Sequence, residues 1–400
     1  MKKILWISTY APYDKVAHAG GKTHNYYIKY FQKSNKFDIH LITLPEKDEV
    51  DKLDLDQYGI SYQIKVLNGN ILQNICRKVY NISSMYNPRH PLCHAIVASH
   101  YTALKHMLYK YAKKESPDIV IMQWTGVSFL IYDVKKLFPD AQTIVIEEDV
   151  AFLGYQRKYE EEKRLTAKKR LYEIYTNLKK KELEVMSVAD IVLTNNEKDK
   201  KLLTDNHIQA GKIFVMPPFF DNYRNVQPER NRNTILYYGA MAREENHRCA
   251  MWLIDEIMPA LKDMDLTLEI IGSHPKNELL NRECDRIHIR GYVENVDEYF
   301  SRALCMAVPL QLGAGIKVKV LEAMSAGIPV LTNHIGIEGI QAVDGKEYFC
   351  CENRQEYIDI IKMLYQNPEK GIEIGKAAKR FIHDQYNLDQ SLDQLIDRIQ

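Results

Sequence analysis

Short apolar runs alternate along the chain with longer stretches of helical character. In the first half the apolar runs occupy residues 3–8, 37–44, 118–123, 141–147, 190–194 and 213–216. Their length is typical of buried strands. The stretch 23–33 is amphipathic, and the stretch 156–186 pairs opposite charges at i, i+4, as helices do. Strands that alternate with helices form parallel sheets, so we predict an α/β domain over residues 1–220.

The alternation is interrupted once and then starts again. Residues 221–233 are polar, with Pro228, four Asn and three Arg, and are predicted to be a linker. Further apolar runs follow at 234–238, 266–271, 287–289, 304–308, 330–332 and 348–350, and the tail 353–400 is helical with a break at Pro368. The restart predicts a second, similar α/β domain.

Length and composition agree with two globular domains. The chain has 400 residues, of which 46% are hydrophobic and 27% charged, which excludes collagen-like, disordered and disulfide-scaffold proteins. Seven cysteines without a CxxC or zinc-type spacing indicate reduced thiols in a cytoplasmic protein and no metal site. The apolar stretch 119–132 is too short for a membrane span, which needs about 20 residues.

Charge is distributed unevenly between the two halves. Residues 1–225 hold 34 Lys and Arg against 26 Asp and Glu, whereas residues 226–400 hold 20 against 27. The basic half, especially around 105–114 and 158–181, suggests an anionic neighbour such as a membrane surface, a lipid phosphate or an acidic glycan. The alternative is a solvated charged helix.

The segment 312–330 has the features of an anion site. The loop residues Gly313, Ala314, Gly315 and Ile316 lead from a strand into a helix predicted over about 316–325. A helix amino terminus offers free N–H groups and partial positive charge. Two lysines, Lys317 and Lys319, occupy the first turns, where each cation costs roughly 0.3–1 kcal/mol. A bound diphosphate would remove that cost; the alternative is that both lysines extend into solvent.

Glu322 lies one helical turn after Lys319 on the same face. A partly buried carboxylate at this place could accept hydrogen bonds from the ribose of a nucleotide, as acidic residues do in Rossmann-type sites. The alternative is an intrahelical Lys319–Glu322 ion pair.

Two further glycine turns have the same character. Gly20 and Gly21 follow the first strand and open a helix, so their amides could meet phosphate. Gly239 ends a strand and places Arg243 and Asn246 at the start of the next helix. An arginine there could hold phosphate oxygens with its planar fork, although it could equally be a surface residue.

Four segments together resemble the carboxyl-terminal domain of glycosyltransferase family 4. They are GAMAREENHRCAMWLIDEIMPAL, LEIIGSHP, IHIRGYVENVDEYFSRA and PLQLGAGIKVKVLEAMSAGIPVLTNHIGIEGI. The resemblance is strong over 234–342 and weaker over 1–220. It implies a retaining enzyme of GT-B fold, in which two Rossmann-like domains face a central cleft and the last helix packs back on the amino-terminal domain. The implied domains are 1–220 with about 380–400, and 234–379.

The resemblance also implies roles for matched positions. Glu322 would bind the ribose, and Arg243 with Lys317 or Lys319 would neutralise the diphosphate. The remaining positions would surround the phosphates, donor sugar and base: Gly20, Gly21, Gly239, Asn246, Tyr292, Val293, Gly313, Ala314, Gly315 and Ile316.

The sequence departs from the family pattern at two places. Many members carry a second Glu eight positions before the helix Glu, where this chain has Ala314. Many also have a His near the acceptor, which Glu148 replaces here if the run Glu147-Glu148-Asp149 is the corresponding one. We therefore expect backbone amides to hold more of the donor sugar, and the acceptor-side assignment rests on Glu148.

The expected function is transfer of a hexosyl or N-acetylhexosaminyl group from a nucleoside-diphosphate sugar, such as a UDP-sugar, to an acceptor hydroxyl, without a cofactor or metal. The acceptor would be a glycan, a lipid-linked glycan or a protein in polysaccharide or glycoconjugate synthesis, with peripheral contact to the inner face of the membrane and no nucleic-acid partner. The alternatives are a nucleotide-sugar epimerase and a non-catalytic transferase that serves as a partner subunit. A nicotinamide dehydrogenase is disfavoured, because no GxGxxG follows a predicted strand.

Overall fold

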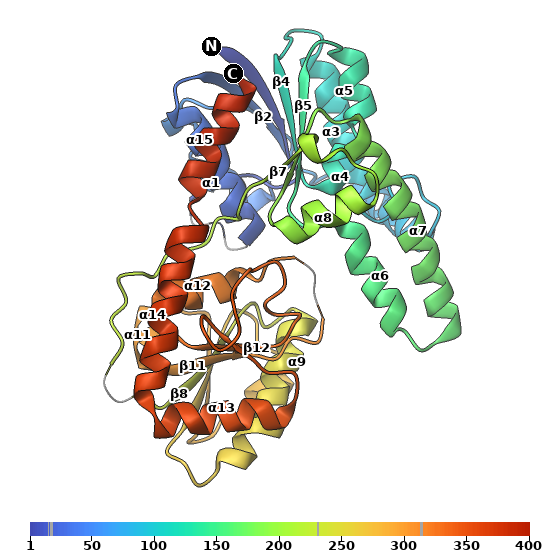
Figure 1. The fold of residues 1–400 in the computed structure, drawn as a ribbon. Coiled ribbons are helices and arrows are strands. Elements are labelled where there is room, and N and C mark those ends of the chain that lie inside the picture. Colours follow the sequence, from blue (N-terminus) through green and yellow to red (C-terminus); the bar gives the residue numbers. More distant parts are fainter. Residues whose placement is uncertain (15, 17–18, 230–231, 313–314) are drawn as a thin grey trace. The chain divides into compact units, whose positions relative to one another are not determined.

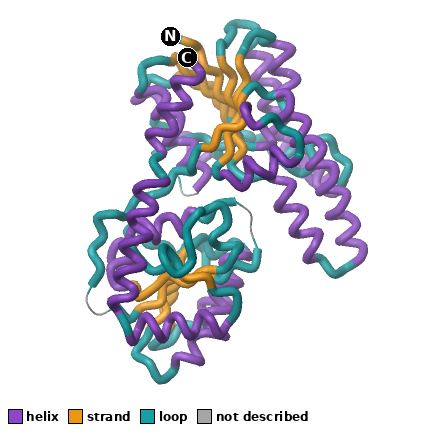
Figure 2. Tube along the Cα trace, in the orientation of Figure 1, coloured by secondary structure: helices purple, strands orange, loops and turns teal. Residues whose placement is uncertain are grey.

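The computed structural model describes residues 1–14, 16, 19–229, 232–312 and 315–400 (Figure 1). The chain divides into two compact units, which we describe separately. Unit 1 comprises Met1–Phe219 and Leu388–Gln400, and unit 2 comprises Phe220–Asn387. Each unit has one parallel sheet with helices (Figure 2), which confirms the predicted α/β class with two Rossmann-like domains. Gly313 and Ala314 of the predicted loop lie outside the described residues.

Unit 1 has a seven-stranded parallel sheet in the order β3-β2-β1-β4-β5-β6-β7. Its strands are β1 (Lys2–Ile7), β2 (Phe37–Thr43), β3 (Ser61–Ile64), β4 (Ile119–Gln123), β5 (Gln142–Glu147), β6 (Ile191–Thr194) and β7 (Ile213–Val215). Its α-helices are α1 (Ala19–Lys33), α2 (Ile71–Tyr86), α3 (Ala98–Tyr111), α4 (Thr125–Ser128), α5 (Ile131–Leu137), α6 (Ala151–Glu161), α7 (Leu165–Val188), α8 (Glu197–Asp205) and α15 (Leu388–Ile399). Short 3-10 turns occupy Lys47–Lys52, Leu55–Tyr58 and Ala210–Lys212.

Helices cover both faces of the unit 1 sheet, and because side chains alternate along each strand, neighbouring residues are buried on opposite faces. Ile4 and Trp6 of β1 belong to a core cluster that also contains apolar residues of α1 and α15. Leu5 and Ile7 belong to a second cluster, with residues of α3, α5 and α7. This double coverage explains why the strands appear in the sequence as continuous apolar runs.

The last helix, α15, completes unit 1 although it ends the chain. Leu392, Leu395, Ile396 and Ile399 are buried in the cluster shared with α1, and Lys2 Nζ donates to the Ile399 carbonyl at 3.0 Å. The final helix therefore packs on the amino-terminal domain, as the resemblance implied. The return begins at Leu388, whereas 380–387 remain with unit 2.

Unit 2 has a six-stranded parallel sheet in the order β10-β9-β8-β11-β12-β13. Its strands are β8 (Thr234–Tyr238), β9 (Thr267–Ile271), β10 (Ile287–Gly291), β11 (Ala303–Val308), β12 (Val330–Thr332) and β13 (Phe349–Cys350). Its α-helices are α9 (Glu244–Trp252), α10 (Asn277–Leu280), α11 (Asp297–Arg302), α12 (Val318–Ala326), α13 (Arg354–Gln366) and α14 (Pro368–Gln385). A π turn (Leu253–Ile257) and a 3-10 turn (Met258–Leu261) continue α9.

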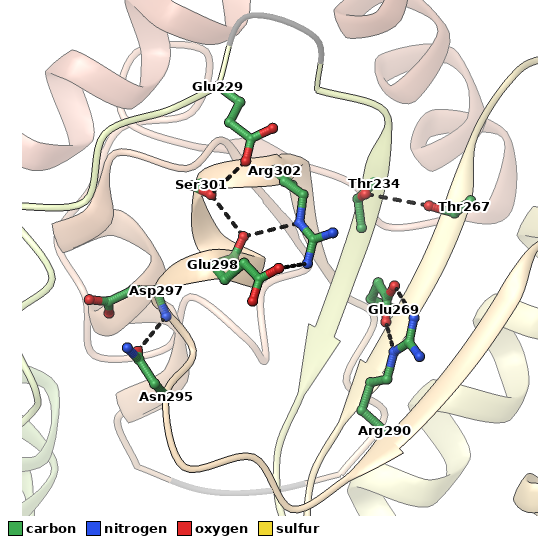
Figure 3. Close-up of polar contacts among 10 residues, drawn as sticks. All are labelled: Glu229, Thr234, Thr267, Glu269, Arg290, Asn295, Asp297, Glu298, Ser301 and Arg302. Atoms are coloured by element: carbon green, nitrogen blue, oxygen red, sulfur yellow. Dashed lines mark hydrogen bonds and ion pairs between the residues drawn. The ribbon is translucent and has the colours of Figure 1, made fainter.

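The described part of the predicted linker 221–233 packs on unit 2. Glu229 N donates to the Ser301 carbonyl at 2.8 Å, and Ser301 Oγ donates to the Glu229 carboxylate at 3.2 Å (Figure 3). Tyr223 N donates to Ser325 Oγ at 3.0 Å, and Val226 is buried in the unit 2 core. The polar composition indicated a linker, but the backbone donors and one apolar side chain anchor the segment to this unit.

The stretch 156–186, predicted as one helix, is interrupted. Helix α6 ends at Glu161 and α7 begins at Leu165. At the break the Glu162 carboxylate accepts the Arg164 backbone N–H at 2.9 Å and also its guanidinium. A local side-chain contact therefore replaces the intrahelical hydrogen bond, without the Gly or Pro that marks a break in a sequence.

The strand order of each sheet reverses at one point. In unit 1 the chain runs outward from β1 to β2 and β3, then returns to place β4 on the other side of β1; in unit 2 the same happens between β8 and β11. Ligands of open parallel sheets bind at the carboxyl ends of the strands beside such a switch point. None of the helices described is both long and apolar enough to cross a bilayer.

Candidate functional site

The switch point of unit 2 contains the residues that the motif 312–330 predicted. Tyr238 and Gly239 end β8, and α12 begins at Val318 after the loop that follows β11. The helix starts two residues later than predicted, so Lys317 is its N-cap and Lys319 lies in its first turn.

Lys319 is turned into the unit. Its Nζ donates to Asn246 Oδ1 at 2.6 Å and to the Tyr237 hydroxyl at 3.2 Å. The ammonium also lies 4.6 Å from the centre of the Tyr237 ring. Burial lowers the pKa of Lys319 to about 8, because a desolvated ammonium is costly. The alternative that this lysine extends into solvent is wrong.

Gly239 provides the space that Lys319 and Asn246 occupy. A Cβ on Gly239 would lie 2.8 Å from Lys319 Nζ and 2.9 Å from Asn246 Nδ2. Asn246 Nδ2 donates to the Ala240 carbonyl at 3.0 Å, which fixes the side chain with Oδ1 toward the lysine. Gly239 thus leaves room for Lys319 and Asn246 hydrogen bonds to it, two contacts that the sequence did not indicate; their predicted place near phosphate stays a prediction.

Glu322 is a buried carboxylate, 6% exposed, on the same helix. It accepts a short hydrogen bond from the Tyr238 hydroxyl and a long one, 3.4 Å, from Asp221 N. Burial and this carboxylate raise the pKa of Tyr238 far above its ordinary value. Sequence reasoning missed Tyr238, which the end of the run 234–238 could have indicated.

Lys317 lies beside a second carboxylate that the sequence did not single out. Its Nζ donates to the Gly315 carbonyl at 2.5 Å and is 3.8 Å from Glu338 Oε2. The side chains of Lys317 and Glu338 are 11% and 10% exposed, so this lysine does not extend into solvent either. Ile316 packs against the unit 2 core.

Arg243 and Tyr292 are more open. Arg243 is the N-cap of α9, and its guanidinium pairs with Glu245 while its side chain is 70% exposed. Its positive charge contributes to lowering the Lys319 pKa, so both cations lie in one electrostatic field. Tyr292 follows β10 and is exposed, whereas Val293 packs against the core.

The switch point of unit 1 brings together Gly20 and Glu148, which are far apart in sequence. Gly20 lies in the first turn of α1, and a Cβ there would be 2.7 Å from Glu148 Oε2. Gln123 Nε2 donates to Glu148 Oε1 at 2.8 Å. Burial raises the pKa of Glu148 to about 8, against opposing hydrogen bonds from Trp124 and Gln123.

Trp124 is a residue of this site that the sequence analysis missed. It follows β4 with φ +72° and ψ 148°, a strained conformation for a bulky residue. Its ring makes edge contacts with Tyr10 and His24. Its indole N–H donates a hydrogen bond to Glu148, and no local sequence signal predicts this contact.

Glu147, the neighbour of Glu148, has a different environment. It is buried, accepts a short hydrogen bond from Thr125 Oγ1, and forms a pair with Glu182, whose carboxylate accepts the N–H groups of Ala151 and Phe152 at 2.7 and 2.9 Å. Burial raises the pKa of Glu182 to about 7 and that of Glu147 well above its ordinary value. Over the described ranges, the acidic, His and Cys side chains form no group that could hold a metal ion.

Comparison with known proteins places these sites in context. Residues 232–367 match the family model described as glycosyl transferases group 1. A trehalose synthase of Pyrococcus horikoshii is 26% identical over 98 residues, which are 24% of this chain and 24% of that protein, so the match spans about a quarter of that relative's length.

Two solved structures are similar over the whole chain. Sucrose-phosphate synthase from Thermosynechococcus elongatus has a TM-score of 0.71 at 15% identity, covering 100% of this chain and 98% of that one. Anabaena HepE in complex with UDP-glucose has a TM-score of 0.65 at 13% identity, covering 100% and 99%. These likenesses show the GT-B fold. The chain thus has the GT-B fold, and residues 232–367 of unit 2 match the glycosyl transferases group 1 model, which supports a glycosyltransferase enzyme.

Proposed function

We propose that the protein is a retaining, family 4 glycosyltransferase that moves a hexosyl or N-acetylhexosaminyl group from a nucleoside-diphosphate sugar to an acceptor hydroxyl. The observation that carries the proposal is the arrangement at the start of α12. There a desolvated lysine, Lys319, lies one helical turn from a buried carboxylate, Glu322. A cation kept in a place that lowers its pKa is typical of a site that binds an anion.

In this proposal different residues of unit 2 bind different parts of the donor. Lys319, Lys317 and Arg243, with the amino terminus of α12, stabilise negative charge on the departing diphosphate, which is the electrostatic work that a metal could otherwise do. Glu322 accepts hydrogen bonds from the ribose, and the backbone near Tyr292 and Val293 faces the base. Neither a metal nor a cofactor is needed in this scheme.

Glu148 is proposed to contact the acceptor. Its pKa of about 8 makes it a stronger base than an ordinary carboxylate and keeps it largely protonated near neutral pH. Gln123 and Trp124 hold it at the carboxyl ends of β4 and β5. It stands where many family members have a His, so it is the residue to test for handling the acceptor hydroxyl.

The donor base and the acceptor class belong to the same proposal. HepE binds UDP-glucose, which supports a UDP-sugar as the first donor to test. We propose a glycan, a lipid-linked glycan or a protein acceptor, in polysaccharide or glycoconjugate synthesis at the cytoplasmic face of a membrane. The basic excess of residues 1–225 supports an anionic environment there.

A thermal-shift screen of UDP-, GDP- and dTDP-sugars tests the donor. A donor at about 100 times its dissociation constant adds about 2.7 kcal/mol of stability, and Glu322→Ala should remove that shift. Incubation with donor alone separates transfer from epimerisation, because an epimerase would convert the sugar without an acceptor. If every nucleotide sugar fails to shift the melting temperature, the non-catalytic alternative is favoured.

A further inference from the structure

Helix α2 has its polar side inside and its apolar side outside. Its exposed large apolar side chains are each between 43% and 81% exposed: Ile71, Leu72, Ile75, Val79, Tyr80, Ile82, Met85 and Tyr86. Of these, Ile71, Ile75, Val79, Ile82 and Tyr86 recur at spacings of three and four, which form one stripe along a helix. A helix that only covers the domain would turn this stripe inward.

The opposite side of α2 makes polar contacts with the rest of unit 1. Asn81 Oδ1 accepts the Ser99 N–H at 3.0 Å, and Ser84 is buried. At the end of the helix the Met85 carbonyl accepts a hydrogen bond from the Arg170 guanidinium at 2.8 Å. These contacts fix the orientation of α2, so the outward apolar stripe is a feature of the folded unit.

Exposed apolar residues are concentrated here. Among the described residues, 17 large apolar side chains are exposed, and eight of them belong to this 16-residue helix. A contiguous exposed apolar patch marks an interaction surface.

The charge around α2 identifies the partner. From Gln57 to Lys114 the chain has no Asp or Glu, while it has eight basic residues: Lys65, Arg77, Lys78, Arg89, Lys105, Lys110, Lys113 and Lys114. This stretch includes α2 and the neighbouring α3, which packs against it. Two of these cations are paired within unit 1, Arg89 with Glu173 at 3.5 Å and Lys105 with Asp133 at 2.9 Å, so the stretch keeps an excess of positive charge. An apolar stripe beside such an excess matches the surface of an anionic bilayer, where acyl chains receive the stripe and headgroups attract the cations.

We propose that α2 docks on an anionic lipid surface, lying in the plane of the membrane with the stripe Ile71, Ile75, Val79, Ile82 and Tyr86 inserted among the lipids. A protein partner of ordinary composition would offer carboxylates only at some points, whereas a bilayer with acidic lipids offers both apolar chains and negative charge along the whole length of α2. The inference deepens the membrane contact of the proposed function, but vesicle binding needs no sugar transfer, so the two can fail separately.

The test is co-sedimentation of the full-length protein with phosphatidylcholine vesicles, with and without phosphatidylglycerol. The wild type should bind the vesicles that contain phosphatidylglycerol, less at high salt, and Ile75→Asn/Val79→Asn should bind about tenfold more weakly or worse. The matched control, Leu280→Asn/Val343→Asn, removes two exposed apolar side chains of unit 2 and should bind as the wild type does.

Melting temperature and donor-induced stabilisation, measured on the same variants, show that each one is folded. Equal binding by Ile75→Asn/Val79→Asn and the wild type would overturn the proposal, as would wild-type protein that ignores acidic vesicles. If the wild type is a dimer in solution and the α2 variant a monomer, with no vesicle binding by either, the stripe contacts a second copy instead.

Discussion

The ammonium of Lys319 lies 2.6 Å from Oδ1 of Asn246, so the side-chain amide of Asn246 holds a partly buried cation at the start of α12. The Asn246 amide in turn donates to the carbonyl of Ala240, in the loop that follows β8. The lysine is therefore positioned before any ligand arrives. Preorganised charge of this kind costs no rearrangement when a diphosphate binds.

Removing the charge of Lys319 should weaken donor binding more than removing the Asn246 amide that holds it. We expect Lys319→Met to weaken binding of a nucleoside diphosphate by about ten- to a hundredfold, the effect of a lost charge-assisted hydrogen bond. Asn246→Leu, which keeps the charge but not its position, should have a smaller effect. Titration calorimetry measures the dissociation constant of the nucleoside diphosphate for both variants. If Asn246→Leu weakens binding about ten- to a hundredfold while Lys319→Met does not, the lysine has no direct role.

Donor affinity should depend on pH through Lys319. The pKa of this group is about 8 in the free protein, and a bound diphosphate would raise it. Binding then takes up a proton above pH 8, so affinity is greatest below pH 8 and falls by up to about tenfold per pH unit above it. Lys319→Met should flatten the profile. If the donor affinity of the wild type does not change between pH 7 and pH 10, the Lys319 ammonium does not contact the donor.

Gly239→Ala should disturb the same pair without altering any charge. The new Cβ would lie within 3 Å of both Lys319 Nζ and Asn246 Nδ2, so the lysine must move. We expect donor affinity to fall by about tenfold, with a loss of stability of about 1–3 kcal/mol from overpacking. Gly345→Ala, where no atom lies within 4 Å and φ is +71° against +157° at Gly239, is the control for a glycine replaced at positive φ without a steric clash. Equal effects of both variants on affinity would argue against the steric explanation.

Glu148→Gln should separate acceptor chemistry from donor binding. The amide preserves the shape of a side chain that Gln123 contacts at 2.8 Å but cannot take up a proton. We expect transfer to fall by about a hundredfold or more, within the range of lost general base catalysis, with donor affinity unchanged. The readouts are kcat for transfer and the donor dissociation constant; retention of kcat would remove Glu148 from the reaction.

The Glu147–Glu182 pair should make the protein less stable as pH rises. Both carboxyls have a raised pKa in the folded state, about 7 for Glu182. Such groups contribute stability that is complete below their unfolded pKa of about 4.3 and is lost as pH rises through the folded value. Melting temperature should therefore decline from about pH 5 to 8, and Glu147→Gln should reduce the decline. If the melting temperature declines with pH equally in the wild type and in Glu147→Gln, other groups cause the decline.

The sequence predicted what depends on local pattern. Buried parallel strands appear as apolar runs, and the donor motif carries Lys317, Lys319 and Glu322 within one turn and helix. The contacts that complete each site are tertiary. Lys319 meets Asn246 across 73 residues, and Gly20 faces Glu148 only because β1, β4 and β5 are neighbours in the sheet. The strained Trp124 leaves no local signal.

Helix α2 shows a different limit. Its spacing reveals two faces, but periodicity does not say which face is inside, and the usual expectation is the apolar one. The polar contacts of Asn81 with α3 decide the orientation. The break at Glu162 is similar, because a single carboxylate satisfies the backbone where the charge pattern favoured a continuous helix.

Helix α15 has a consequence for biosynthesis. Unit 1 is built from two stretches that are far apart in sequence, Met1–Phe219 and Leu388–Gln400, so the apolar surface that receives Leu392, Leu395 and Ile396 stays uncovered until these residues have been synthesised. The whole of unit 2, Phe220–Asn387, is synthesised in between. The amino-terminal unit, although its strands are made first, therefore closes only after the chain of unit 2 has been made.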